Sequence, residues 1–156
     1  MKLVLANFDD IHKLSEIDKK VNPTPWSTND YLGSYNNKNN KIFLIKHNNQ
    51  IIACITVSIV MSDAEIIQLW VRDSFQRQGI ATKMLQQTIN LLKHKYFINH
   101  IYLEVMINNT GAISLYKKFN FQELGTRKGY YKIAGDRVDA LTMLKLIDDD
   151  FIYQDS

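Results

Sequence analysis

The sequence contains few of the residues that cross-link a chain or bend it sharply. Its 156 residues include one cysteine, two prolines and six glycines. A single thiol, Cys54, excludes a disulfide within the chain. It lies in the apolar segment "IIACITV" with no histidine at a recognisable spacing, so we expect a buried structural cysteine rather than a nucleophile.

Long apolar runs are also missing. No run approaches the roughly 20 residues that span a bilayer. An acidic pair, Asp9 and Asp10, interrupts the first segment before a signal-peptide core can form. We therefore expect a cytoplasmic protein that does not enter a membrane. The few histidines have no metal-ligand spacing, and we predict no metal site; they are His12, His47, His94 and His100.

The charge balance is mild. Nineteen Lys and Arg against 16 Asp and Glu give a net charge of +3 at pH 7. This excess is too small to indicate nucleic-acid binding, although it suits an anionic cofactor. The length suits one domain, which we place at residues 1–147, followed by an acidic tail at residues 148–156. We expect a monomer or a weak dimer.

Hydrophobic periodicity predicts four helices and seven strands. The first helix has Asp9 or Asp10 near its N-cap, and it ends before "NPTPW", which holds both prolines. Ser27–Asp30 resembles a capping box that opens a second helix. Later helices follow Gly79 and Asn109. Strands are expected at Lys2–Ala6, Lys41–Lys46, Ile51–Met61, Ile66–Val71, His100–Met106, Phe121–Lys128 and Val138–Leu146.

The predicted order of elements is β-α-α-β-β-β-α-β-α-β-β. It begins with an antiparallel meander and ends with two strand–helix units. This order predicts an α+β (mixed α/β) domain with helices on both faces of one sheet.

The stretch "QRQGIAT", from Gln76 to Thr82, lies where a strand meets a helix. Free N–H groups and the dipole at a helix N-terminus attract anions. A glycine allows close approach of the backbone, Arg77 adds positive charge, and Thr82 adds a hydroxyl. The stretch lacks both the P-loop and the dinucleotide signatures. It therefore predicts either a phosphate-binding loop or an ordinary turn with an exposed arginine.

Two further side chains can carry chemistry. Glu104 lies in an otherwise apolar strand, on the face shared by Tyr102 and Met106. A carboxylate there is unfavourable unless it is paired or lies in a cleft, where it can act as a general base. Tyr116, on the following helix, can donate a proton to a leaving group. The alternatives are a solvated strand face for Glu104 and core packing for Tyr116.

Taken together, these residues resemble the GNAT superfamily of N-acetyltransferases. "QRQGIA" matches the acetyl-CoA motif of that superfamily, with Ala81 where many members carry glycine. The downstream run "YLEV…NNTGAISLYKKFNF…RKGYY" looks like the bacterial ribosomal-protein alanine N-acetyltransferases. "PWS" at Pro25–Ser27 and "DRVDALTM" at Asp136–Met143 also fit that branch. The resemblance covers nearly the whole chain.

The resemblance implies a mostly antiparallel sheet of six to seven strands with one splayed strand pair. It implies that acetyl-CoA lies along the splayed strand, near Leu69, Trp70 and Val71, with the amide of Val71 polarising the thioester carbonyl. The pyrophosphate would contact the helix start beyond the strand. The residues implied there are Gln76, Arg77, Gln78, Gly79, Ile80, Ala81 and Thr82, with Asn109 from the next helix.

The resemblance further implies direct acetyl transfer without a covalent enzyme intermediate. Glu104 would take a proton from the acceptor amine, and Tyr116 would protonate the departing thiolate. The implied acceptor is the N-terminal amine of a small-subunit ribosomal protein. Its groove would be lined by Trp26, Tyr31, Tyr130 and Tyr131. The alternative for these side chains is core or rim packing, which is favoured for Tyr31. Because Tyr130 and Tyr131 are adjacent, at most one should face the groove unless their segment is a loop.

Two departures from the family pattern concern the acceptor more than the fold. Trp70 is bulky where small aliphatic residues are usual, so its side chain should face away from the cofactor. Arg72 stands where an acidic residue is common. Two other functions remain open: acetylation of a lysine or a small-molecule amine, and a non-catalytic acetyl-CoA-binding module.

Overall fold

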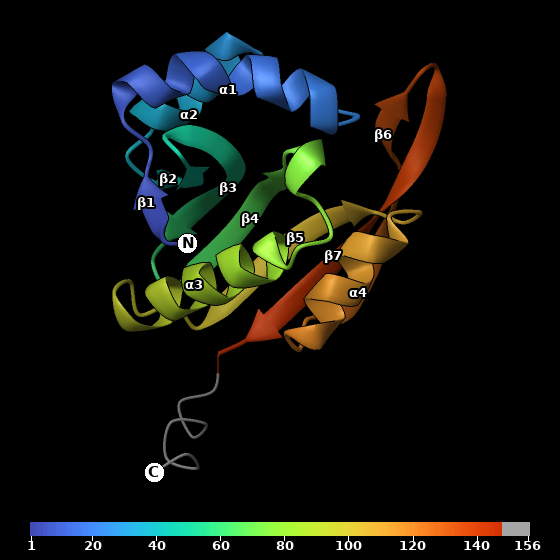
Figure 1. The fold of residues 1–156 in the computed structure, drawn as a ribbon. Coiled ribbons are helices and arrows are strands. Elements are labelled where there is room, and N and C mark those ends of the chain that lie inside the picture. The colour runs from blue at the N-terminus through green and yellow to red at the C-terminus, as the bar shows by residue number, and fades with distance from the viewer. Residues whose placement is uncertain (148–156) are drawn as a thin grey trace.

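The computed structural model describes residues 1–147, and the predicted acidic tail at residues 148–156 lies outside them. Seven strands form one sheet that is covered by helices on both faces (Figure 1). The strands are β1 (Leu3–Leu5), β2 (Asn40–His47), β3 (Gln50–Val60), β4 (Asp63–Val71), β5 (His100–Met106), β6 (Gln122–Ile133) and β7 (Asp136–Leu146). The helices are α1 (Phe8–Val21), α2 (Thr28–Asn36), α3 (Ile80–His94) and α4 (Thr110–Lys118), with a short 3-10 turn at Asp73–Phe75.

The strand order is β1-β2-β3-β4-β5-β7-β6, and every neighbouring pair except β4–β5 is antiparallel. The parallel β4–β5 pairing covers Asp63–Ile66 against His100–Leu103 and then stops. Residues 67–71 of β4 therefore lie beside β5 without pairing to it. The predicted fold class and its splayed strand pair are confirmed.

An irregularity in β4 coincides with the separation. Against β3, Val57 pairs with Ile66 and Thr56 pairs with Gln68, so Ile67 is an extra residue in β4. Such a bulge bends a strand and re-aims the side chains beyond it. The strand leaves β5 immediately after its last paired residue, Ile66.

Two hydrophobic clusters lie on opposite faces of the sheet. The larger one packs α3 and α4 against the sheet, with Met84, Leu85 and Leu92 fully buried. The smaller one packs α1 and α2 against the other face and includes Leu14 and Tyr31. Figure 1 shows α1 and α2 together on one side of the sheet, with α3 and α4 on the other.

The first two helices begin at capping boxes, one predicted and one not. Ser27 and Asp30 cap α2 as expected. Helix α1 has Asn7 as its N-cap, and Asp9 and Asp10 lie in its first turn, near the N-cap as predicted. The Asn7 side chain accepts a bond from the backbone of Asp10, whose carboxylate accepts one from the backbone of Asn7.

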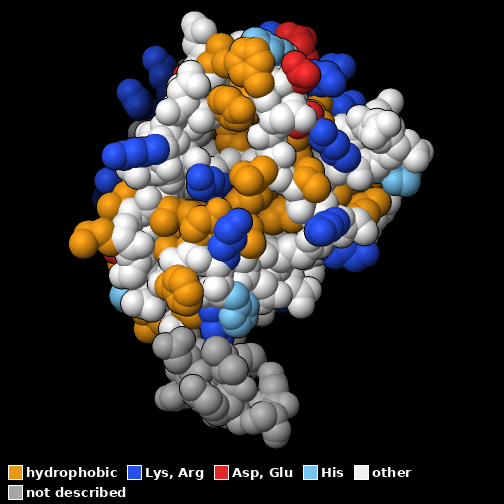
Figure 2. Space-filling model, turned by 90° about the vertical axis from the view of Figure 1, so that its left-hand side faces the viewer, with side chains coloured by type: hydrophobic (Ala, Val, Ile, Leu, Met, Phe, Trp, Pro, Cys, Tyr) orange, Lys and Arg blue, Asp and Glu red, His pale blue; other side chains and the backbone are white. Residues whose placement is uncertain are grey.

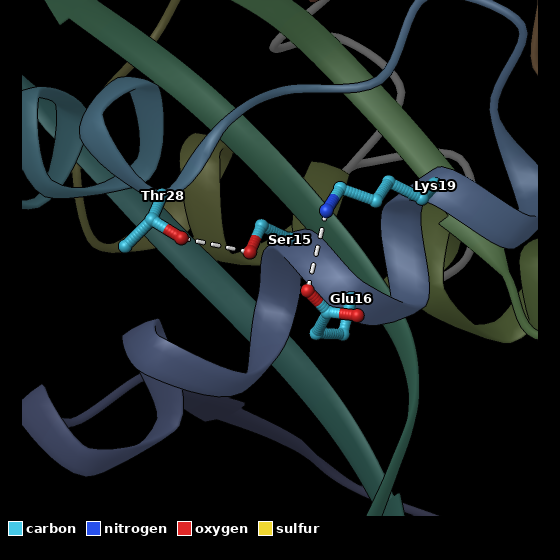
Figure 3. A network of polar contacts seen from close by, with 4 residues as sticks. All are labelled: Ser15, Glu16, Lys19 and Thr28. Atoms are coloured by element: carbon cyan, nitrogen blue, oxygen red, sulfur yellow. Dashed lines mark hydrogen bonds and ion pairs between the residues drawn. The ribbon is translucent and has the colours of Figure 1, made fainter.

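Side-chain contacts then join the two helices (Figure 3). The Ser15 hydroxyl on α1 lies 2.9 Å from that of Thr28 at the start of α2. Beside it, Lys19 and Glu16 form an exposed ion pair at 3.2 Å. The hydroxyl contact fixes α2 against α1 where the chain enters α2.

Two strand boundaries differ from the prediction by three residues or more, and the others differ by two or fewer. Strand β4 begins at Asp63 rather than at Ile66, because the chain already turns at Met61, which has a φ of 55°. Strand β6 continues to Ile133 instead of ending at Lys128. Both extensions are strands because they pair with a neighbouring strand, which their own residues do not indicate.

The edge of the sheet at β1 carries exposed apolar side chains, including Val4, Leu5 and nearby Phe8. Figure 2 views the molecule from this side and shows hydrophobic side chains interspersed with Lys and Arg. Helices long and apolar enough to cross a membrane do not occur within residues 1–147.

Candidate active site

A cleft of about 750 Å³ opens where β4 and β5 separate. Its walls come from the α1–α2 connection, β4, the start of α3, the end of β5, α4 and β6. It therefore brings together segments far apart in the chain, including "QRQGIAT", Glu104 and Tyr116.

The end of β4 presents backbone groups to this cleft. Arg72 N–H donates to the carbonyl of Ile52 on β3 at 2.8 Å. Backbone groups alternate sides along a strand, so those of Leu69 and Val71 point away from β3, toward the gap. The Val71 carbonyl accepts a bond from the Gln76 side chain at 2.9 Å. The Val71 N–H is thus available to a ligand in the gap.

Trp70 lies between these two residues and faces the other way. Its side chain is buried in the cluster beneath α1 and α2, and its indole N–H donates to the Tyr31 hydroxyl at 3.0 Å. By the same alternation its backbone groups face β3. This agrees with the expectation that the indole avoids the cofactor side. Arg72 donates its side-chain Nε–H to the Ile51 carbonyl at 3.1 Å.

The loop before α3 has an unusual backbone. Gly79 is the N-cap of α3 with a φ of 79°, and no side chain caps the helix. The first N–H groups of α3, at Ile80, Ala81 and Thr82, therefore lack a side-chain acceptor. Arg77 also has a positive φ, 62°, which is uncommon for a residue with a Cβ. This uncapped N-terminus beside the β4 gap fits an anionic group such as a pyrophosphate.

Other residues of the predicted cofactor set divide into two groups. Gln76, Arg77, Gly79 and Asn109 line the cleft. Gln78 does not, and its side chain bonds to the Ser74 carbonyl at 3.3 Å. Asn109 is the N-cap of α4, since its side chain accepts a bond from the Ala112 N–H at 3.2 Å.

Glu104 lies in the cleft, and its carboxylate is paired. Arg127 Nη1 lies 3.0 Å from Oε1 and 3.4 Å from Oε2. A second carboxylate, Glu65, lies on the same face of the sheet and also lines the cleft. Partial burial raises the pKa of Glu65, the nearby Glu104 raises it further, and Arg127 lowers it. Sequence reasoning missed Arg127 and Glu65, because only the sheet order brings β4, β5 and β6 together.

Two tyrosines in the cleft remain protonated at neutral pH. Burial, followed by the neighbouring Tyr131, raises the pKa of Tyr116 to about 12. Burial, Glu104 and Tyr130 raise the pKa of Tyr131 to about 12. Both hydroxyls can therefore donate protons but do not ionise under ordinary conditions. Tyr131 is close enough to influence both Tyr116 and Glu104.

Tyr130 and Tyr131 both line the cleft although they are consecutive. In a regular strand they would face opposite sides. The register of β6 against β7 is irregular between Arg127 and Tyr131, and Gly129 has a φ of 60°. This irregularity lets both rings face the cleft, where they meet edge to face at 5.0 Å.

Tyr31 does not line the cleft, which corrects its place in the predicted groove and agrees with the core packing favoured as its alternative. It is fully buried, and its hydroxyl donates to Asp18 and accepts from Gln68 and Trp70. The Trp26 ring, which does line the cleft, packs on the Tyr31 ring at 5.2 Å. Tyr31 therefore lies behind the wall. Its position in the helix indicates this burial, because Tyr31 lies on the same face of α2 as the buried Ser34.

Cys54 is buried in β3, where burial raises the pKa of its thiol. A buried, protonated thiol is a poor nucleophile, which agrees with the structural role predicted for it. Clusters of three or more potential metal ligands are absent from the part of the chain that the structure describes.

Residues 9–121 match the family model "Acetyltransferase (GNAT) family". The [ribosomal protein bS18]-alanine N-acetyltransferase of Haemophilus ducreyi is 34% identical over 137 residues, which cover 86% of this chain and 92% of the relative. The N-alpha-acetyltransferase of Sulfolobus acidocaldarius is 41% identical over 78 residues, 50% of this chain and 45% of that protein.

A solved structure of an N-acetyltransferase is also similar to this chain. The crystal structure of the ribosomal-protein-S18-alanine N-acetyltransferase from Escherichia coli superposes with a TM-score of 0.88 at 25% identity, covering 94% of each chain. The family match spans most of the chain, and the relative from Haemophilus ducreyi matches it nearly end to end. This chain belongs to the GNAT family of acetyltransferases.

Proposed function

We propose that this protein transfers the acetyl group of acetyl-CoA to the N-terminal α-amine of a protein, most specifically of a small-subunit ribosomal protein. One observation carries the proposal. The gap between β4 and β5 lies beside the uncapped N-terminus of α3, in a cleft that also contains Glu104 and Tyr116. The relative named as a bS18-alanine N-acetyltransferase supports the choice of acceptor.

Each part of the cleft has a role in this proposal. Acetyl-CoA supplies an activated thioester. The α3 N-terminus, with Arg77 and Gly79, holds the pyrophosphate, and the backbone of Leu69 and Val71 holds the pantetheine arm. The Val71 N–H donates to the thioester carbonyl and stabilises the charge that develops there.

Proton transfers would be made by two side chains. Glu104 accepts a proton from the acceptor's α-ammonium, which frees the lone pair that attacks the acetyl carbon. The amine attacks the acetyl carbon and forms the C–N bond, the C–S bond breaks, and Tyr116, still protonated at neutral pH, gives its proton to the thiolate. The second proton that the amine nitrogen loses restores the Tyr116 hydroxyl. Trp26, Tyr130 and Tyr131 would form the walls around the acceptor's first residues.

The test is thiol release from acetyl-CoA with three acceptors. These are a peptide that begins with alanine, a peptide with a blocked N-terminus and one lysine, and a polyamine. We expect turnover with the first alone, and loss of it in Glu104→Gln. Preference for the lysine or the polyamine would favour the second function left open by the sequence. Tight acetyl-CoA binding without turnover of any amine would favour a binding module.

A further inference from the structure

Arg127 connects the proposed base to the wall of the acceptor groove. Its guanidinium contacts both carboxylate oxygens of Glu104 and lies over the Tyr130 ring, 5.0 Å from its centroid. The guanidinium therefore already binds the carboxylate that the acceptor's ammonium must reach. The ammonium has to compete with Arg127 for the lone pairs of Glu104.

The charges around Glu104 leave room for one more cation. Glu65 on β4 adds a second carboxylate, which lines the same cleft and pairs in register with Tyr102, on the Glu104 face of β5. These two carboxylates and the one guanidinium of Arg127 leave one negative charge unbalanced. The single positive charge of an acceptor's α-ammonium would balance it.

Arg127 is also the more exposed partner of the pair. Its side chain is 57% exposed, against 21% for Glu104, and it lies where β6 loses its regular register with β7. Glu65, which is exposed at the cleft, offers the guanidinium another carboxylate nearby.

We propose that Arg127 is a displaceable counter-ion, which holds the position beside Glu104 that the acceptor's α-ammonium takes and moves toward Glu65 when the acceptor binds. The inference rests on the proposed function, since it requires an amine that approaches Glu104. Arg127 is a positioning residue in this scheme. It selects against weakly binding amines, because an acceptor must outcompete the guanidinium to reach the base.

The test measures steady-state kinetics with the alanine-starting peptide at saturating acetyl-CoA. Arg127→Met removes the cation and keeps most of the stem. We expect the KM for the peptide to fall about two- to five-fold, the range for a partly exposed ion pair, with a smaller change in kcat. Arg127→Lys should retain the wild-type KM. Methylguanidinium should raise the KM of Arg127→Met and leave that of the wild type nearly unchanged.

Glu65 tests the second half of the proposal. Glu65→Gln should raise the peptide KM by a similar factor, because Arg127 then has no alternative carboxylate. The same substitution in the Arg127→Met background should have little effect. Lys128→Met is the matched control, since it removes an equal charge from the neighbouring residue and should leave the KM unchanged.

Specific outcomes separate this inference from the proposed function. If the wild type does not acetylate the peptide, the proposed function fails, and the inference fails with it. If the wild type is active but Arg127→Met has an unchanged or higher KM, only the inference fails, because Arg127 then supports the Tyr130 wall or binds the acceptor directly. Unchanged acetyl-CoA affinity in each variant shows that it is folded.

Discussion

The two faces of the sheet are built differently. The α3–α4 face buries a large apolar cluster, and Thr88 is the one buried polar residue in either of those helices. The α1–α2 face buries Asp10, Ser15, Asp18 and Ser34. Asp10 pairs with Lys46 at 2.8 Å, whereas Asp18 is held by the Tyr31 hydroxyl and by the Trp26 N–H at 3.1 Å.

This difference follows from what each face presents to the cleft. On the α3 side the proposed ligand contacts are backbone N–H groups, which depend on helix and strand geometry and need only an apolar support. On the α1–α2 side the contacts are side chains such as Trp26, whose position depends on a network of buried hydrogen bonds. Substitutions on the first face should affect the cofactor or turnover, and those on the second should affect stability and the acceptor.

The largest effect is expected for Tyr116→Phe, on the α3–α4 face. Loss of a general acid typically lowers the rate by roughly 10²- to 10⁴-fold. We expect kcat to fall by about that range while the acetyl-CoA affinity, measured by calorimetry, is nearly intact. An unchanged kcat would remove Tyr116 from the acid role.

Tyr31→Phe tests the other face. It removes the hydroxyl that bonds to Asp18, Gln68 and Trp70. The buried Trp70 N–H loses its acceptor, and the buried Asp18 carboxylate loses one donor while it keeps the Trp26 N–H. We expect about 2–4 kcal/mol lower stability in urea unfolding, since unpaired buried polar groups cost roughly 1–3 kcal/mol and charged ones more. The KM for the peptide should rise, and the affinity for acetyl-CoA should stay unchanged.

Tyr35→Phe is the matched control on the same helix, because Tyr35 is partly exposed and no hydrogen bond of its hydroxyl occurs within residues 1–147. It should change neither stability nor KM. Equal effects of the two substitutions would contradict the importance of the buried network.

The third prediction concerns how the free energy of unfolding changes at alkaline pH. The pKa of Tyr116 is raised from 10.0 to about 12 in the folded protein, so the native state binds the proton more tightly than the unfolded chain. This contribution, roughly 2–3 kcal/mol, is complete below pH 10 and is lost as the pH rises through about 12. Urea unfolding between pH 9 and 12 should show a smaller decline for Tyr116→Phe. Parallel declines would show that Tyr116 does not cause the loss.

Gly79→Asp is expected to have the smallest effect of the four, about ten-fold weaker acetyl-CoA binding. A Cβ at Gly79 meets no atom within 4 Å, so the cost comes from the positive φ, about 1–2 kcal/mol, and from negative charge beside the phosphate. Gly79→Ala carries the backbone cost alone and isolates it. Normal affinity in Gly79→Asp would mean that the loop does not bind the phosphates.

Most of the fold could be predicted because its elements are marked locally. The period of Ile80, Met84 and Leu92 indicated α3, and the box at Ser27 and Asp30 marked α2. The boundaries that were missed depend on pairing: Asp63 and Lys132 belong to strands because β3 and β7 lie beside them. The cofactor side of the site was indicated by one continuous stretch. The acceptor side was indicated less well. Tyr31 packs in the core, the alternative favoured for it, and both Tyr130 and Tyr131 line the cleft where at most one was expected.

The sequence by itself therefore determined the order of elements, the free N-terminus after Gly79 and the face on which Glu104 lies, because each depends on residues close together in the chain. Only the tertiary structure decided which charges surround Glu104. Strand β7 pairs between β5 and β6, and the irregular register of β6 turns Arg127, Tyr130 and Tyr131 toward β5. Contacts between strands more than 20 residues apart follow from sheet order and register, which local patterns do not encode.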